Sequence, residues 1–114
     1  MIASTAYLSI QPTQRIAQGS DWSSAVAVKQ ADGTAQDVTA YSVDFVAEVY
    51  GKAIAGAIAK TNAAAGLISI SLTDAQTREF YAPAMGVGQL WAETGTTRIL
   101  MMTFPIFTVA EVKP

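Results

Sequence analysis

Residues 18–50 read QGSDWSSAVAVKQADGTAQDVTAYSVDFVAEVY, and this stretch decides the fold class that we predict for the chain. Two runs in it place a mostly apolar set of side chains on every second residue. These sets are Trp22, Ser24, Val26 and Val28 in the first run, and Tyr41, Val43, Phe45, Ala47 and Val49 in the second. A period of two is typical of β-strands that have one face on a core. We therefore predict strands at about 22–30 and 41–50.

A turn separates these two runs. Asp32-Gly33 is a strong signal for a tight turn, because both residue types tolerate the left-handed backbone that such turns need. A polar linker that contains Asp37 and Thr39 follows it. We expect the two runs to pair with each other as antiparallel strands.

The rest of the chain repeats short apolar runs and turn residues. Residues 6–10 predict a short strand that ends at Gln11-Pro12, because proline cannot donate a backbone hydrogen bond to a neighbouring strand. Residues 1–12 are then either an edge strand or an arm that reaches a neighbouring subunit. The alanine-rich residues 52–65 fit a helix or a strand. The nearby glycines argue against a stable helix, and the flanking strands favour a hairpin, so we predict a strand; these glycines are Gly51, Gly56 and Gly66.

Residues 66–72 predict a strand whose even-numbered side chains, Ile68, Ile70 and Leu72, face the core. Thr73 and Gln76 have the spacing of a helix capping box, so we expect one short helix at about 73–81 that ends before Pro83. The remaining expected elements are a loop over 82–88 and strands at 89–93, 98–103 and 106–112, with Pro105 interrupting the last two.

These elements predict an all-β domain. Seven to nine short strands, with turn signals roughly every 8–12 residues, are typical of an antiparallel β-sandwich. At 114 residues the chain has the length of one domain with a single core. We therefore assign residues 1–114 to one sandwich domain that carries one short helix.

The composition excludes several classes of site. The sequence has no cysteine and no histidine, which excludes disulfides, zinc sites built on those residues, and Ser-His-Asp triads. The seven basic residues are scattered, so we expect no nucleic-acid role. No apolar run approaches the roughly 18 residues of a membrane span, and no targeting leader is evident, so we expect no membrane role.

Charge is scarce, at 14% of the residues against roughly 25% in ordinary soluble domains. A small domain must leave about a third of its unfolded-chain surface in water. Few charges are available to cover that surface, which favours association with copies of the chain or with other proteins. The alternative is a neutral surface rich in alanine, serine and threonine.

No catalytic, cofactor or metal site is predicted, so we expect the protein not to be an enzyme. Asp44 and Glu48 share a strand face about 13 Å apart, too far for a glycosidase pair. Asp32 and Asp37 flank a turn, where aspartate binds backbone amides; calcium binding is the weaker alternative. Serine and threonine have no neighbouring base, and Gly86-x-Gly88 is too short for a phosphate loop.

Two groups of apolar residues remain as candidate contact sites. Among the aromatic residues, we predict a core position for Trp22, Tyr41 and Phe45, while three others form either buried contacts or an exposed platform that stacks on sugars: Tyr50, Tyr81 and Trp91. Residues 99–107 read as apolar on both strand faces. One face belongs to the core and the other is either covered by the 73–80 helix or forms a subunit interface. The interface residues would be Met101, Met102, Phe104, Ile106 and Phe107.

Several short motifs resemble those of small virion proteins of tailed phages. The family pattern has a G-D-x-W opening, a D-G-x-x-x-D-L-T-G-Y turn and a later G-x-I-x-L-x-L-T-x-x-x-T strand. The matching residues are Gln18-Gly19-Ser20-Asp21-Trp22, Ala31-Asp32-Gly33-Thr34, Asp37-Val38-Thr39-Ala40-Tyr41, Gly66-Leu67-Ile68-Ser69-Ile70-Ser71-Leu72-Thr73 with Thr77, and Arg98-Ile99-Leu100. The chain is thus similar to the N-terminal domain of phage upper baseplate proteins, with departures at Ala40 and at Leu90-Trp91-Ala92-Glu93.

The resemblance implies an immunoglobulin-like sandwich that acts as a structural component of the virion, assembled in the cytoplasm of a bacterial host. A tail or baseplate adaptor and a capsid decoration (cement) protein are the two roles that we expect. The implied partners are copies of the chain, in a trimer or a higher ring, and other virion proteins. A glycan-binding module for host adhesion is the alternative.

Overall fold

The computed structural model describes residues 13–30 and 32–110. The strand predicted at 6–10, the possible arm at 1–12 and the end of the strand predicted at 106–112 lie outside these residues. The strands are β1 (Gln14–Ala17), β2 (Trp22–Ala27), β3 (Ser42–Val49), β4 (Lys52–Ala55), β5 (Ala57–Asn62), β6 (Leu67–Leu72), β7 (Ala84–Thr94) and β8 (Thr97–Val109). The two helical elements are the 3-10 turn η1 (Ala63–Ala65) and the helix α1 (Asp74–Arg78).

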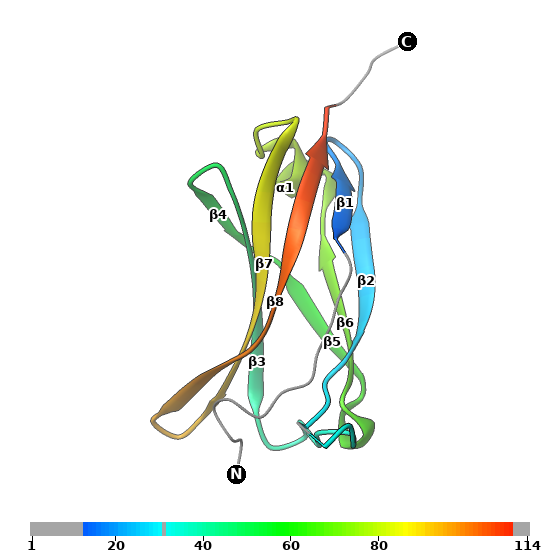
Figure 1. Ribbon diagram of the computed structural model, residues 1–114, viewed down its shortest axis with the longest axis vertical. Helices are drawn as coiled ribbons and strands as arrows, with labels where there is room; N and C mark the ends of the chain where they lie inside the picture. Colours follow the sequence, from blue (N-terminus) through cyan, green and yellow to red (C-terminus); the bar gives the residue numbers. More distant parts are fainter. Residues whose placement is uncertain (1–12, 31, 111–114) are drawn as a thin grey trace.

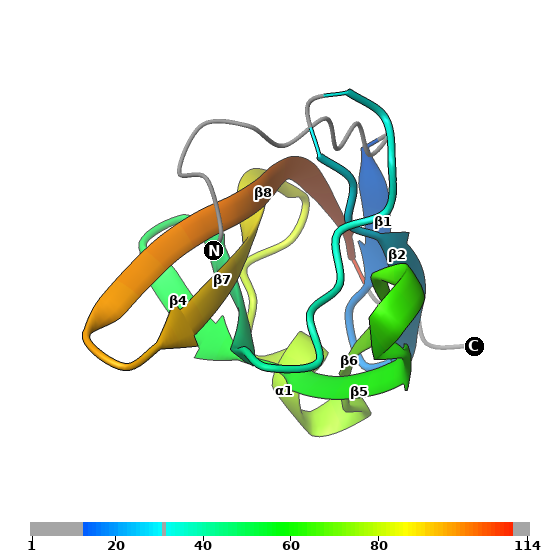
Figure 2. The ribbon, with the colours of Figure 1, turned by 90° about the horizontal axis from the view of Figure 1, so that it is seen from below.

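The strands form two sheets that face each other (Figures 1 and 2). The larger sheet has the order β1-β8-β7-β3-β4, and the smaller has the order β2-β6-β5. All neighbours are antiparallel except β1 and β8. The prediction of an all-β sandwich is confirmed, with eight strands among the described residues.

The alternation that predicted the strands is the alternation that builds the core. Along β3, the side chains of Val43, Phe45, Ala47 and Val49 are buried and those between them are exposed or half-buried. The even-numbered residues of β6 are buried in the same way. Both sets belong to one apolar cluster between the sheets. Burial of that cluster on both inner faces is what holds the layers together.

The expected pairing of the first two runs is wrong, because they lie in different sheets. β2 pairs with β6 along six residues, and β3 pairs with β7 along eight. The Asp32-Gly33 turn closes only a short local hairpin, in which Lys29 bridges Ala35 and the Gln30 amide donates to the Thr34 carbonyl at 2.8 Å. The chain then crosses from one sheet to the other, so the turn signal was correct and the inferred partner was not.

The strand prediction for residues 52–65 is confirmed as far as Asn62, while Ala63–Ala65 form the 3-10 turn η1. Gly56 divides the segment between the two sheets, with β4 in the larger and β5 in the smaller. A Cβ atom at Gly56 would lie 2.5 Å from Cδ2 of Phe45 and 2.6 Å from the backbone oxygen of Ser71. Only glycine allows the chain to pass this closely between a core ring and the opposite sheet.

The last two strands are longer than predicted. β7 begins at Ala84, inside the expected loop at 82–88, and β8 runs through Pro105 without a break. The Val109 carbonyl accepts from the backbone amide of Gln18 on the β1 side of β8. Backbone groups of alternate residues point to the same side of a strand, so the nitrogen of Pro105, four residues earlier, also faces the β1 side. β1 pairs only with residues 106–109, and the missing proline donor therefore costs no bond to β7.

The predicted capping box is present at the start of α1. The Thr73 side chain accepts from the Gln76 amide, and the Gln76 side chain accepts from the Thr73 amide. The helix is shorter than the expected 73–81 and stops at Arg78, because Phe80 turns inward and is 1% exposed. The buried hydroxyl of Thr77 binds the loop before β2.

Replacing Gly56 with alanine is expected to lower the free energy of unfolding by about 3 kcal/mol, since the neighbouring ring and backbone oxygen have no free space to move into. Urea unfolding measures the change. The exposed neighbour Ala55 supplies the control, because Ala55→Ser should change stability by no more than about 0.5 kcal/mol. Equal effects of the two substitutions would show that the crossover is not tightly packed.

Candidate functional site

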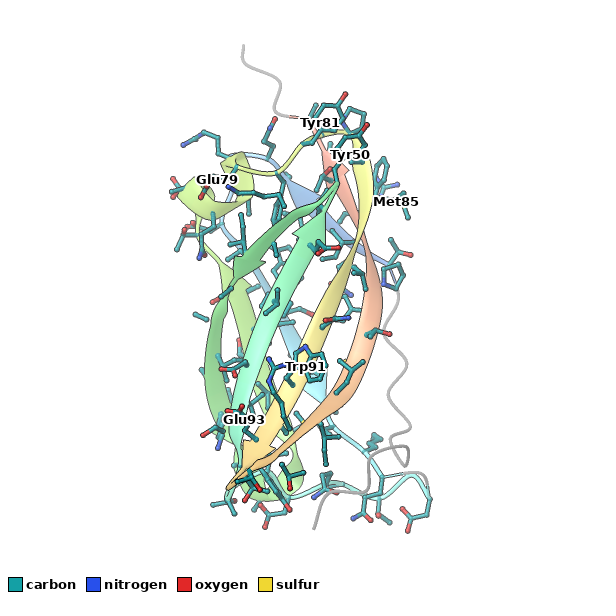
Figure 3. The ribbon with its side chains drawn as sticks, turned by 90° about the vertical axis from the view of Figure 1, so that its left-hand side faces the viewer. Tyr50, Glu79, Tyr81, Met85, Trp91 and Glu93 are labelled. Atoms are coloured by element: carbon teal, nitrogen blue, oxygen red, sulfur yellow. The ribbon has the colours of Figure 1, made fainter. Side chains whose placement is uncertain are left out.

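Three large, exposed, apolar side chains gather at one end of the sandwich (Figure 3). Tyr50 is 79% exposed, Tyr81 is 59% exposed and Met85 is 60% exposed. Val49 of β3 pairs with Gly86 of β7, and this is the last pair of the two antiparallel strands. Tyr50 and Met85, the next residue on each strand, therefore lie at the same end of the sheet. We call these three residues the tyrosine tip. Exposed apolar groups gathered at one place are typical of contact surfaces, whereas single ones are ordinary.

The backbone at Tyr50 is unusual for a residue of its size. Tyr50 and Gly51 form the two-residue turn between β3 and β4, and both have positive φ, at 53° and 82°. Hairpin turns of this kind favour asparagine, aspartate or glycine. A side chain other than glycine pays about 1–2 kcal/mol for the left-handed conformation.

The two tyrosine rings are stacked, with centroids 4.9 Å apart and an angle of 24° between their planes. Stacking occupies one face of each ring, and the high exposure of both residues leaves further ring surface in water. An ion pair lies beside the turn, where Lys52 Nζ is 3.4 Å from Glu79 Oε1. The tip therefore combines flat apolar surface, two hydroxyl groups and one pair of opposite charges.

A second apolar surface continues from the tip along the outside of β7 and β8. It consists of three cross-strand pairs, which we call the outer face: Met85 with Phe107, Val87 with Pro105, and Trp91 with Leu100. The polar pair Gln89–Thr103 lies between the second and the third. The guanidinium of Arg98 lies 4.2 Å from the centroid of the Trp91 ring and 3.6 Å from Glu93. Apart from Met85 and Pro105, which are exposed, these side chains are half-buried.

The predicted interface at residues 101–107 needs correction. Met101, Met102, Phe104 and Ile106 are at most 4% exposed and belong to the core, and only Phe107 lies on the outer face. The strand has a bulge here: Leu90 pairs with Met102 but Trp91 pairs with Leu100. Met101 is thus an extra residue, and two consecutive methionines face inward. The bulge explains why the run read as apolar on both faces.

The three aromatic residues predicted for the core are there, but the three residues of the possible platform do not stay together. Phe45 is buried, and Trp22 and Tyr41 pack against the core as expected. Of the three residues of the possible platform, Tyr50 and Tyr81 come together, while Trp91 lies further along β7 (Figure 3). The Arg98 guanidinium lies over the Trp91 ring. The sequence contained no signal for this division, because the register of β7 decides where Trp91 points.

Asp32 and Asp37 each close a local turn, as predicted. Oδ1 of Asp32 accepts hydrogen bonds from the Thr34 hydroxyl at 2.6 Å and the Thr34 amide at 2.9 Å, and Asp37 accepts the same two bonds from Thr39. The threonine hydroxyl, followed by the threonine amide, lowers the pKa of each carboxyl group below its usual 3.8. Within the described residues no group of three acidic side chains is placed to hold a metal ion.

No family model and no curated protein matches the chain. A solved structure of domains 4 and 5 of the S-layer protein SbsC is similar, with 12% sequence identity and a TM-score of 0.47. The alignment covers 91% of this chain and 51% of the S-layer structure, so this chain spans about half the length of that structure. In the part of the chain that the structure describes, no helix is long and apolar enough to cross a membrane.

Met102→Glu is expected to lower the free energy of unfolding by more than about 4 kcal/mol, because it places a carboxylate in the core. Phe107→Glu, on the same strand but on the outer face, should cost only about 1 kcal/mol. Chemical denaturation of both variants measures the difference. A folded Met102→Glu protein of native stability would restore the original interface assignment.

The two aspartate turns should stabilise the fold above the ordinary aspartate pKa of 3.8 and lose that contribution as the pH falls below it, because the folded state holds both carboxylates at lower pKa. Replacing both with asparagine should therefore flatten the fall in Tm between about pH 4 and about pH 2. Asp44→Asn is the matched control, since no hydrogen bond to the Asp44 carboxylate is seen among the described residues. An unchanged Tm profile in the double variant would contradict this assignment.

Proposed function

We propose that this protein is a non-enzymatic structural component of a tailed-phage particle, acting through protein–protein contacts as a tail or baseplate adaptor or as a capsid decoration protein. The tyrosine tip is the observation that carries the contact role. The phage assignment is supported by the sequence motifs around Trp22, Asp32 and Ile68, which resemble those of upper baseplate proteins. An immunoglobulin-like connectivity and a place in the virion belong to the same proposal.

The chemistry of the tip suits a protein partner. Tyrosine and methionine are enriched in protein interfaces, and tyrosine buries a large area with little loss of side-chain freedom. The two-residue turn between β3 and β4 carries Tyr50, and the stacked Tyr81 ring restricts the orientation of its side chain. Pre-organised anchors of this kind reduce the entropic cost of association.

The outer face supports contacts over a wider area. Its first pair contains Met85, which also belongs to the tip, so the two surfaces share a residue. The polar pair Gln89–Thr103 separates the third apolar pair from the first two. A partner that binds the tip can therefore extend over the sheet. We propose that the partners are other copies of the chain, in a trimer or a higher ring, and neighbouring virion proteins.

A second candidate function is glycan binding for host adhesion. The exposed ring surface of Tyr50 and Tyr81 favours it, because aromatic faces stack on sugars, and Lys52 of the Lys52–Glu79 ion pair directly follows the turn that carries Tyr50. Sugar binding would raise the Tm by mass action. A protein partner would not give that response to soluble sugars.

Replacing both tyrosines of the tip with serine should leave the fold intact and reduce incorporation into particles at least tenfold, since the variant removes the exposed anchors but no core group. Quantitative mass spectrometry of purified particles gives the copy number. Hundreds of copies would indicate a head lattice or tail tube, and a few dozen or fewer would indicate a tail, baseplate or portal position.

Leu67→Ser is the matched control, because Leu67 is also exposed, at 40%, but lies on β6 in the other sheet. Its incorporation should equal that of the wild-type chain. Absence of the protein from purified particles would refute the virion role. A sugar-dependent rise in Tm that disappears in the tyrosine variant would then favour the glycan reading.

A further inference from the structure

One edge of the larger sheet is incomplete. β3 pairs with β7 along its whole length, Ser42–Val49, but its register with β4 covers only residues 46–49. The last backbone bond on this side runs from the Gly56 amide to the Phe45 carbonyl, at 2.9 Å. Among the described residues, residues 42–44 of β3 therefore have a neighbouring strand on one side only. Open strand edges are templates for another extended chain.

A groove lies against this open edge and is lined by residues of β3, β4, β5 and β8. Its volume is about 370 Å³. Val43, Phe45 and Ile58 supply its apolar lining, and Asp44 and Arg98 stand on its border with one charge of each sign. The smaller sheet forms the opposite wall through β5, so the groove admits an extended chain rather than a second domain.

The backbone groups on the open edge define one pairing position. Tyr41, Val43 and Phe45 direct their backbone groups to the same side, because alternate residues of a strand do so. The Tyr41 carbonyl accepts from Lys60 Nζ and the Phe45 carbonyl accepts from the Gly56 amide. Val43 lies between these two occupied positions and offers an amide and a carbonyl to an incoming strand.

We propose that residues 6–10 of a second copy of this chain occupy the groove as an added β-strand. These residues are Ala-Tyr-Leu-Ser-Ile, so Ala6, Leu8 and Ile10 share one strand face. The whole segment before Arg15 carries no charged side chain. An uncharged strand with one apolar face matches a groove that combines the side chains of Val43, Phe45 and Ile58 with backbone groups and two border charges of opposite sign.

The copy that supplies the strand must be a different molecule. The described chain begins beside the start of β1, which pairs with β8, and the groove lies beyond β7 and β3 at about three strand spacings, or about 14 Å. The groove is also several residues further along the strands. Residue 10 is three residues from Thr13 and can be at most about 10 Å away. Residues 6–10 therefore cannot all lie in the groove of their own chain.

The other open edge near the arm is a poorer match. β8 is unpaired on its β1 side before Ile106 among the described residues, but Pro105 faces that side and has no amide to donate. A strand added to β8 before Ile106 would lack the backbone hydrogen bond that a residue with an N–H group at position 105 would donate. The edge of β3 at Val43 keeps both of its backbone groups.

The absence of cysteine gives a clean background for a crosslinking test. Ser9→Cys protein is mixed with Ala55→Cys protein under mild oxidation, and tryptic peptides are analysed by mass spectrometry. Ala55 is exposed and lines the groove, so the disulfide between the two peptides should form at least tenfold more than with Ala25→Cys. Ala25 is an exposed alanine on β2 of the other sheet and is the matched control.

A yield no greater than that of the control would overturn the proposal. The double variant, with both cysteines in one chain, provides the second arm: a mixture of isotope-labelled and unlabelled protein should give crosslinked peptides of mixed isotope. Crosslinks confined to one isotope would show that the arm binds its own chain, which would also overturn it.

The full-length chain gives an independent readout. Leu8→Asp with Ile10→Asp should lower the molar mass in sedimentation to that of the monomer, because it places charge against the apolar lining of the groove. Ser9→Asp lies on the opposite face of the arm and should leave the mass unchanged. Because this experiment needs no phage particle, failure of the virion role and failure of this proposal are separately detectable.

Discussion

The packing of the Phe45 ring is the constraint on which the rest of the structure depends. This ring lies 5.8 Å from Trp22 of the smaller sheet and 6.1 Å from Phe104 of the larger one, and it is 1% exposed. The chain crosses between the sheets at Gly56, directly against the ring. Aromatic contacts therefore set the distance between the layers at the same point where the backbone changes layer.

This crossover also produces the incomplete edge. β4 leaves the larger sheet after pairing with only half of β3, since the chain must reach β5 in the other layer. The rest of the β3 edge is left beside the groove that we assign to a partner strand. Lys60 binds the Val38 and Tyr41 carbonyls next to it, and a lysine at such a position discourages unspecific strand pairing. The edge is thus restricted to a short position at Val43.

The two proposed contact regions differ in their physical basis. At the tyrosine tip, a strained hairpin turn holds flat side chains in water, and the attraction for a partner lies in side-chain burial. At the groove, the attraction lies in backbone hydrogen bonds that a neighbouring strand completes. The outer face joins the tip along β7 and β8, and the scarcity of charge in the sequence agrees with a molecule that shares much of its surface.

The sequence by itself determined the all-β class, the strands predicted at about 22–30, 41–50 and 66–72, the capping box at Thr73 and the aspartate turns, because each depends on residues close together in the chain. Only the tertiary structure decided that β2 and β3 lie in different sheets, that β8 continues through Pro105, and that a bulge at Met101 turns both methionines inward. It also separated Trp91 from Tyr50 and Tyr81. Strand pairing and register depend on partners distant in sequence, and a period-two pattern fixes the face of a residue without identifying the strand beside it.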